Sequence, residues 1–133
     1  MSKSALYVAN TSTQLVAVDG IINLGNIVRR FGCGANLSGN NIVLDEVGYY
    51  DVNVSITASP TAIGTVTATL FNNGVAVVGG NASQTVTVAD DTTNLSFESV
   101  VRVFCGANAG SLSLVLTGTE SNVSNVAVTV KKL

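Results

Sequence analysis

The segment Tyr50-Asp51-Val52-Asn53-Val54-Ser55-Ile56-Thr57-Ala58 decides the fold class, because apolar and polar side chains alternate along its whole length. Successive side chains of an extended chain point to opposite faces, so one face of this segment is apolar and the other is polar. This period of two is typical of a β-strand with one buried face. Pro60 follows and predicts the end of the strand, because proline cannot donate to a sheet ladder.

The same alternation recurs on both sides of this segment and predicts an all-β chain. Threonine alternates with apolar residues in 65–70, and Ser111 and Ser113 alternate with Leu112, Leu114 and Leu116. Branched Val and Thr side chains favour strands, and no long stretch shows the apolar period of a helix. We expect strands near Ala5–Ala9, Gln14–Val18, Ile21–Phe31, Ile42–Asp45, Tyr49–Ser59, Gly64–Phe71, Val75–Val78, Gln84–Val88, Thr93–Phe104, Ser111–Thr117 and Val123–Lys131.

Turn residues separate these predicted strands. Asn73-Gly74 lies between two apolar runs and readily takes the positive φ values of a type I′ turn, so we predict a tight hairpin there. About ten short strands at this spacing favour a β-sandwich, a jelly roll or a barrel. The length of 133 residues fits a single domain over 1–133, in which 1–12 form either an N-terminal arm or the first strand.

The composition excludes several classes of protein and favours self-association. Hydrophobic residues make up 47% of the chain and charged residues 11%, the reverse of the balance in a disordered chain. A surface built from Thr, Ser, Asn and Gly loses little charge hydration on contact with another subunit, so we expect an oligomer. The net charge is −2, and no basic cluster exists beyond Arg29-Arg30 and Lys131-Lys132, which argues against nucleic-acid binding.

Hydropathy argues against a membrane protein. No apolar run approaches the roughly 18 residues of a transmembrane helix. The first residues also lack the apolar core of a signal peptide. We therefore expect a protein that is made and folded in a cytoplasm and has no membrane partner.

Residues that most catalytic sites need are missing. The chain has no His, so it can form neither a Ser-His-Asp triad nor a Cys-His pair. The acidic pairs Asp45-Glu46 and Asp90-Asp91 fall short of the roughly six to eight oxygen ligands that Ca²⁺ takes. The glycine-rich pieces precede no predicted helix that could bind a phosphate. We predict a non-enzymatic protein without a cofactor or a metal site.

Two cysteines, Cys33 and Cys105, have two interpretations. They are too few for a disulfide-dense scaffold, so they are either free thiols or one disulfide between adjacent strands. Both lie close to an arginine in the sequence, but the chain offers no His that could activate them.

Three arginines, Arg29, Arg30 and Arg102, are candidates for a binding site because they lie inside apolar β segments. A guanidinium in such a place is costly unless it is paired or reaches an anion. One alternative is an anion-binding pocket near a subunit interface. The other is an ion pair, within the chain or across subunits, with one of the acidic residues Asp51, Glu98 and Asp45.

Three segments resemble the C1q/TNF-like superfamily of trimeric jelly rolls. Asn41–Ile56 is similar to its central segment, in which a short strand leads through Gly48-Tyr49-Tyr50 into a long inner strand. Ala68–Gly74 looks like its strand that ends in an Asn-Gly hairpin, and Val123–Val130 is similar to its closing strand. The resemblance implies a single-domain, C1q/TNF-like jelly-roll β-sandwich of about ten strands that assembles as a homotrimer.

Two further segments, Ser4–Thr11 and Ile27–Cys33, look like small proteins found in the genomes of tailed phages of Gram-positive bacteria. This resemblance implies a structural protein of the virion, such as a head fibre or decoration protein. Its partners would be phage capsid proteins, and it would be made in the cytoplasm of the host bacterium.

The alternative function is a soluble trimeric binding protein of the same fold. It would hold a host-surface glycan or a small anionic ligand at its subunit interfaces, as a phage-encoded sponge for a host signal molecule would. Arg29, Arg30 and Arg102 would then be its ligand-binding residues.

Overall fold

The structure, a computed structural model, describes residues 3–104 and 110–133. These residues form twelve β-strands, and the described part of the chain contains no helix, so the predicted all-β class is confirmed. The strands are β1 (Ala5–Asn10), β2 (Gln14–Val16), β3 (Gly20–Ile21), β4 (Asn26–Phe31), β5 (Ala35–Ser38), β6 (Asn41–Leu44), β7 (Gly48–Pro60), β8 (Gly64–Asn72), β9 (Val75–Val86), β10 (Thr93–Val103), β11 (Gly110–Thr117) and β12 (Ser121–Lys132).

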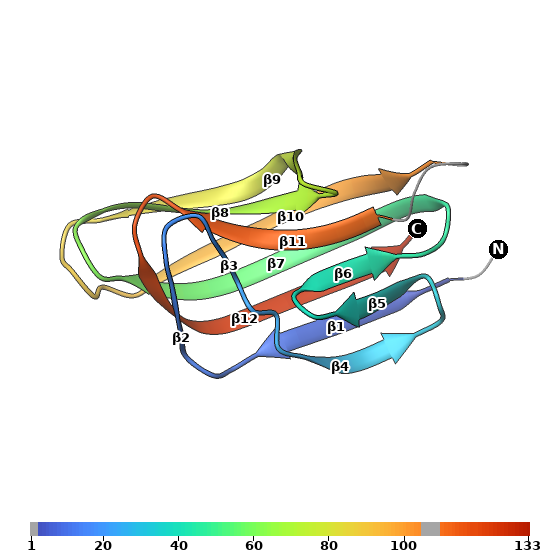
Figure 1. The fold of residues 1–133 in the computed structure, drawn as a ribbon, viewed down its shortest axis with the longest axis horizontal. Helices are drawn as coiled ribbons and strands as arrows, with labels where there is room; N and C mark the ends of the chain where they lie inside the picture. The colour runs from blue at the N-terminus through green and yellow to red at the C-terminus, as the bar shows by residue number, and fades with distance from the viewer. Residues whose placement is uncertain (1–2, 105–109) are drawn as a thin grey trace.

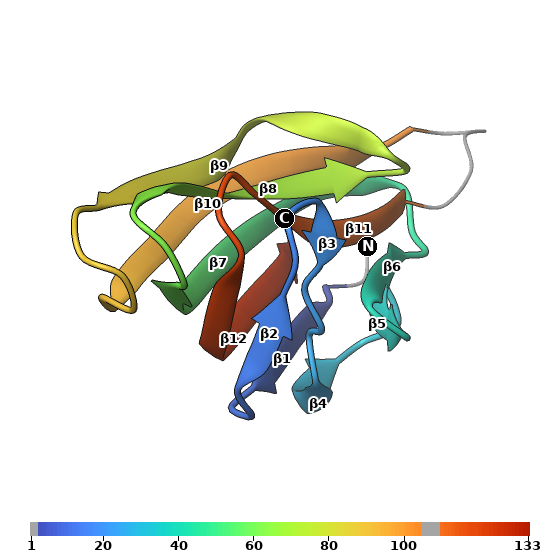
Figure 2. The ribbon, with the colours of Figure 1, turned by 60° about the vertical axis from the view of Figure 1, so that its left-hand side comes forward.

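The strands form two sheets that pack face to face as a jelly-roll sandwich (Figure 1, Figure 2). Sheet A has the order β10-β7-β12-β1-β4, with β2 also paired to β12. Sheet B has the order β5-β6-β11-β8-β9, with β3 also paired to β11. The two ends of the chain lie at the same end of the sandwich (Figure 1), where Lys132 N donates to Ser4 O at 2.8 Å.

Strand β7 supplies the centre of the core. Its inward residues Tyr50, Val52, Val54, Ile56 and Ala58 are each at most 3% exposed, as the alternation in the sequence predicted. β7 pairs with β10 on one side and with β12 on the other, so it lies inside sheet A. Its apolar side chains join those of sheet B in one continuous core cluster, whose removal from water drives folding.

Two predicted strand ends are confirmed. Asn73 and Gly74 have φ values of 53° and 82°, as a two-residue hairpin between β8 and β9 requires. Pro60 is the last residue of β7, and its carbonyl accepts a 2.8 Å bond from Asp90 N in the turn before β10.

The predicted single strand Ile21–Phe31 is wrong, because the chain crosses between the sheets within it. β3 pairs with β11 in sheet B, whereas β4 pairs with β1 in sheet A. Gly25 lies between them with a φ of 80°, and a Cβ there would come within 2.3 Å of Ala9 O. Ile22 and Leu24 are buried along the crossing, so their apolar character reflects the core and not a strand.

Three other predicted boundaries differ from the structure. The structure joins two predicted strands, Val75–Val78 and Gln84–Val88, into the single strand β9, which ends at Val86. Gly79-Gly80 form a bulge within it and not a turn. The register with β8 shifts between Thr69 and Phe71, so residues 77–80 face Leu70 alone. The short strand β5 was not predicted because it follows a glycine-rich segment, and β2 ends at Val16 instead of Val18.

We predict that Leu114→Ala lowers the free energy of unfolding by about 2–5 kcal/mol, because it removes buried methyl groups and leaves a cavity. Leu114 in β11 is 1% exposed. Ser113→Ala is the matched control, since Ser113 points outward and should change stability by less than about 0.5 kcal/mol. Urea unfolding followed by circular dichroism measures both variants, and equal effects would contradict the assignment of the two faces.

Candidate functional site

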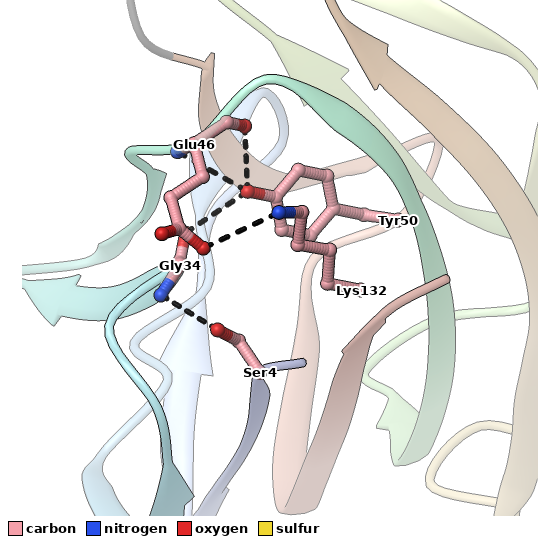
Figure 3. Close-up of polar contacts among 5 residues, drawn as sticks. All are labelled: Ser4, Gly34, Glu46, Tyr50 and Lys132. Atoms are coloured by element: carbon pink, nitrogen blue, oxygen red, sulfur yellow. Dashed lines mark hydrogen bonds and ion pairs between the residues drawn. The ribbon is translucent and has the colours of Figure 1, made fainter. Parts of the chain in front are cut away.

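A polar cluster closes the end of the sandwich that carries both chain ends (Figure 3). The Tyr50 hydroxyl lies 2.7 Å from Glu46 O and 3.2 Å from Gly34 O, and it accepts a bond from Glu46 N at 3.2 Å. Gly34 N in turn donates to Ser4 Oγ at 2.8 Å. These bonds fasten the turn before β7 and the turn before β5 to the start of β1.

An ion pair completes this cluster (Figure 3). Lys132 Nζ lies 3.4 Å from Glu46 Oε1, and the Lys132 side chain is only 8% exposed. Burial is the main cause that raises the pKa of Tyr50, with a further contribution from the charge of Glu46. Every polar group shown in the cluster is bonded to another part of the same chain, so the cluster stabilises the fold.

The outer face of sheet A is the other surface that the structure singles out. Because the strands are antiparallel and in register, outward residues of neighbouring strands line up in rows across the sheet. One row is Val100, Asp51, Lys131, Ala5 and Phe31, and the next is Glu98, Asn53, Thr129, Tyr7 and Arg29. We call this surface the assembly face; each row runs from β10 at one edge of the sheet to β4 at the other.

The middle of the assembly face is shallow and uncharged. An open hollow of about 580 Å³ lies there, lined by Tyr7, Asn53, Val54, Ser55, Ser96, Phe97, Ala127 and Thr129. None of these side chains carries a charge at neutral pH, so little hydration of charge would be lost if another surface covered the hollow.

The charged groups of the assembly face lie outside the hollow, and Lys131 is the one among them on the central strand, β12. Glu98 on β10 and Asp51 on β7 form a carboxyl pair, and Arg29 lies on β4 at the opposite edge. The hydrogen bond with the Asp51 carboxyl, followed by the charge of that group, raises the pKa of Glu98. Asp51 Oδ1 is buried and has no hydrogen-bond partner within the described residues.

The structure places the three predicted arginines in three different settings, and all three are exposed. Arg29 donates from Nη1 to Val28 O at 3.1 Å. Arg30 donates from Nε to Ala35 O at 3.1 Å and so ties the edge of sheet A to sheet B. The Arg102 guanidinium stacks 4.3 Å from the centre of the Phe104 ring and 5.3 Å from that of Tyr49.

One copy of the chain does not bring these arginines together. Arg29 and Arg30 lie on β4 and Arg102 lies on β10, which are opposite edges of sheet A. Within residues 3–104 and 110–133, none of the three makes an ion pair with Asp51, Glu98 or Asp45. An ion pair across subunits and an anion pocket at a subunit interface both stay predictions.

Cys33 is an exposed free thiol in the turn between β4 and β5. Cys105 lies outside the described residues. Asp45-Glu46 and Asp90-Asp91 lie in turns, and no group of three or more potential metal-ligating side chains gathers in the part of the chain that the structure describes. In that same part, no helix has the length and apolar character needed to span a bilayer.

Sequence reasoning missed the apolar edge formed by β9 and β10. Val75 and Val100 line one hollow of about 240 Å³ between the two strands. The exposed fractions are 69% for Val75, 98% for Val78, 55% for Val100 and 53% for Phe104. The sequence predicted strands in both places, but alternation alone does not tell which strand lies at the edge of a sheet.

Comparison with known proteins supports the fold and leaves the function open. No protein-family model matches the chain, and no curated protein matches it in sequence. Murine APRIL superposes with a TM-score of 0.76 at 12% identity, over 99% of this chain and 100% of that one. The globular domain of zebrafish complement 1qA gives a TM-score of 0.70 at 10% identity, over 97% and 95% of the two chains.

A viral protein has the same architecture. The PRD1 vertex protein P5 superposes with a TM-score of 0.65 at 14% identity, over 98% of this chain and 96% of that one. At these identities the similarity shows the fold alone. The chain therefore has the C1q/TNF-like jelly-roll fold that its sequence resembles.

We predict that Tyr50→Phe destabilises the protein by about 1–3 kcal/mol, because it removes the hydrogen bonds that the buried Tyr50 hydroxyl makes with the backbone of Glu46 and Gly34. Urea unfolding at neutral pH measures the change. Tyr49→Phe is the matched control, since Tyr49 is 49% exposed and should change stability little. A Tyr50→Phe variant as stable as the wild type would show that the polar cluster does not hold the sandwich end closed.

Stability should also fall at alkaline pH, and Tyr50 should cause part of the fall. The pKa of Tyr50 is raised by burial above its unfolded value of about 10, so the folded state holds the proton more tightly. Its contribution is fully present below pH about 10 and is lost as pH rises through the folded pKa. Urea midpoints measured from pH about 8 to 11 should fall less steeply for Tyr50→Phe than for Tyr49→Phe, and equal slopes would contradict this assignment.

Proposed function

We propose that this protein is a non-enzymatic, homotrimeric structural protein of a phage virion, such as a head fibre or decoration protein. The observation that carries the proposal is the presence of two different exposed surfaces, each suited to cover the other. One is the assembly face of sheet A, and the other is the apolar edge of β9 and β10.

The apolar edge favours a partner because Val75 and Val100 line one hollow there and other apolar side chains along β9 and after β10 are exposed. Val75, Val78, Val100 and Phe104 are each more than half exposed. Soluble monomers rarely expose large contiguous apolar surfaces, and such surfaces commonly mark interfaces. The assembly face offers a matching partner, because its middle is uncharged and hollow.

A contact between two different surfaces of identical chains is heterologous, so it repeats from copy to copy and closes into a ring when the rotation allows. C1q/TNF-like domains typically form homotrimers, and this chain has their fold at low sequence identity. A ring of three copies is therefore the assembly that we propose. A rotation axis parallel to the strands would bring the β10 edge of each copy onto the β4 side of the assembly face of the next.

The virion role is supported by two independent observations. Ser4–Thr11 and Ile27–Cys33 resemble small phage proteins in sequence. The PRD1 vertex protein P5 is a viral protein with the same fold. These two observations favour the structural role over the alternative of an anion-binding protein.

A non-enzymatic role agrees with the setting of the polar groups. The polar cluster around Tyr50 is bonded internally. Glu98 of the Asp51–Glu98 pair is exposed to solvent, whereas catalytic groups work in sites that exclude water.

We predict that the purified protein has a mass of three chains, each of 13.5 kDa, in solution. Light scattering coupled to size-exclusion chromatography at micromolar concentration measures the mass. A mass of one chain across this range would overturn the homotrimer.

We also predict that the protein is present in purified particles of the phage that encodes it. Peptide mass spectrometry of gradient-purified virions, washed at high salt, measures its copy number relative to the major capsid protein. A trimer found only in the infected-cell lysate would overturn the virion role and favour the soluble binding protein.

A further inference from the structure

We propose that Arg29 of each copy binds the Asp51–Glu98 carboxyl pair of the neighbouring copy, and that this contact fixes how the copies align in the ring. The inference rests on the proposed homotrimer and names the residues that make its interface specific. Among the described residues of one copy, Arg29 makes no ion pair, and the carboxyl pair has only Lys131 beside it.

The carboxyl pair carries more negative charge than the basic residue beside it can balance. Glu98 and Asp51 lie on the adjacent strands β10 and β7 and both point outward. Lys131 on β12 lies directly opposite Asp51 in the same row. Among the described residues, it is the basic residue beside the carboxyl pair in that row. Its single charge cannot balance two carboxylates. Glu98 is exposed, so a donor from another copy can reach its carboxylate, and two neighbouring carboxylates favour an added cation.

Arg29 is the matching donor, and it cannot reach the pair in its own copy. Arg29 and Glu98 stand at opposite ends of one row, with Asn53, Thr129 and Tyr7 between them. Four interstrand spacings of about 4.8 Å separate their backbones by about 19 Å. The guanidinium carries several N–H donors in a planar fork that fits carboxylates, and the structure gives it one bond, to Val28 O.

The register aligns Arg29 with the carboxyl pair of a second copy. Rotation about an axis parallel to the strands keeps every residue at its own height along that axis, so the two ends of one row meet between neighbouring copies. Glu98 would then meet Arg29, and Val100 in the next row would meet Phe31. One row therefore joins opposite charges and the next joins two apolar side chains.

The surroundings of Arg29 suit such a contact. Tyr7 and Phe31 line a hollow of about 240 Å³ together with Arg29, and the wall of this hollow is mostly apolar. Phe31 is 66% exposed and Val100 is 55% exposed in a single copy. When they cover each other they exclude water beside the ion pair, and charges interact more strongly where water is excluded.

Charge reversal tests the proposal. Arg29→Glu and Glu98→Arg should each raise the concentration for half-dissociation of the trimer at least tenfold, because each places like charges at the contact. The double variant Arg29→Glu/Glu98→Arg should return it to within a few-fold of wild type. Analytical ultracentrifugation over a dilution series measures all four proteins, and circular dichroism verifies that each is folded. Asp91→Arg in an exposed turn is the control, because it changes the net charge as Glu98→Arg does.

The outcomes separate this inference from the homotrimer itself. If the wild type is trimeric and the single reversals leave dissociation unchanged, the ion pair is overturned and the homotrimer stands. If both single variants dissociate and the double variant does not recover, the pairing of these two residues is overturned. A monomeric wild type overturns the homotrimer and this inference together. Arg29→Gln and Glu98→Gln give the same comparison if a reversal prevents folding, and each should weaken the trimer less than the reversal does.

Discussion

The register of β7 against β10 and β12 is the constraint on which the rest of the structure depends. Shifting β7 by one residue would carry Asp51, Asn53 and Ser55 into the core and move Val52, Val54 and Ile56 to the outer face. That exchange would desolvate a carboxylate and expose the centre of the core, so one register is strongly preferred. Because β12 also carries β1, the same register sets the position of every outward residue of sheet A.

Alternation determines which side chains of a strand are buried, but it does not determine how the loops at the ends of the sandwich pack together. Specific hydrogen bonds have to hold those loops in place. Tyr50 supplies them at the end that holds both termini. Its ring belongs to the inward set of β7, while its hydroxyl reaches the backbone of Gly34 and Glu46. One residue thus ties the centre of the core to two turns, and the buried Lys132 joins the last strand to the same point.

The sequence predicted what depends on local pattern and missed what depends on strand order. Alternation identified β7 and its inward residues, and Asn73-Gly74 identified a hairpin. Arg29, Arg30 and Arg102 were singled out on the premise that apolar segments are buried, but β4 is an edge strand with both faces exposed. Neither the strand order β10-β7-β12-β1-β4 nor the rows that cross it can be derived from single segments, because antiparallel neighbours here are distant in sequence.

Because the chain has few charged residues, the position of each one says more about how two copies can pair. The chain has only six basic and eight acidic residues, and Arg29, Lys131, Asp51 and Glu98 all lie in two adjacent rows of one face. A uniformly uncharged face would pair with a copy at many heights, because small polar side chains discriminate weakly between registers. Charges at fixed heights penalise every misaligned pairing, so they confer specificity even where they add little affinity. The strand register that builds the core of one copy therefore also sets the height at which the next copy can bind.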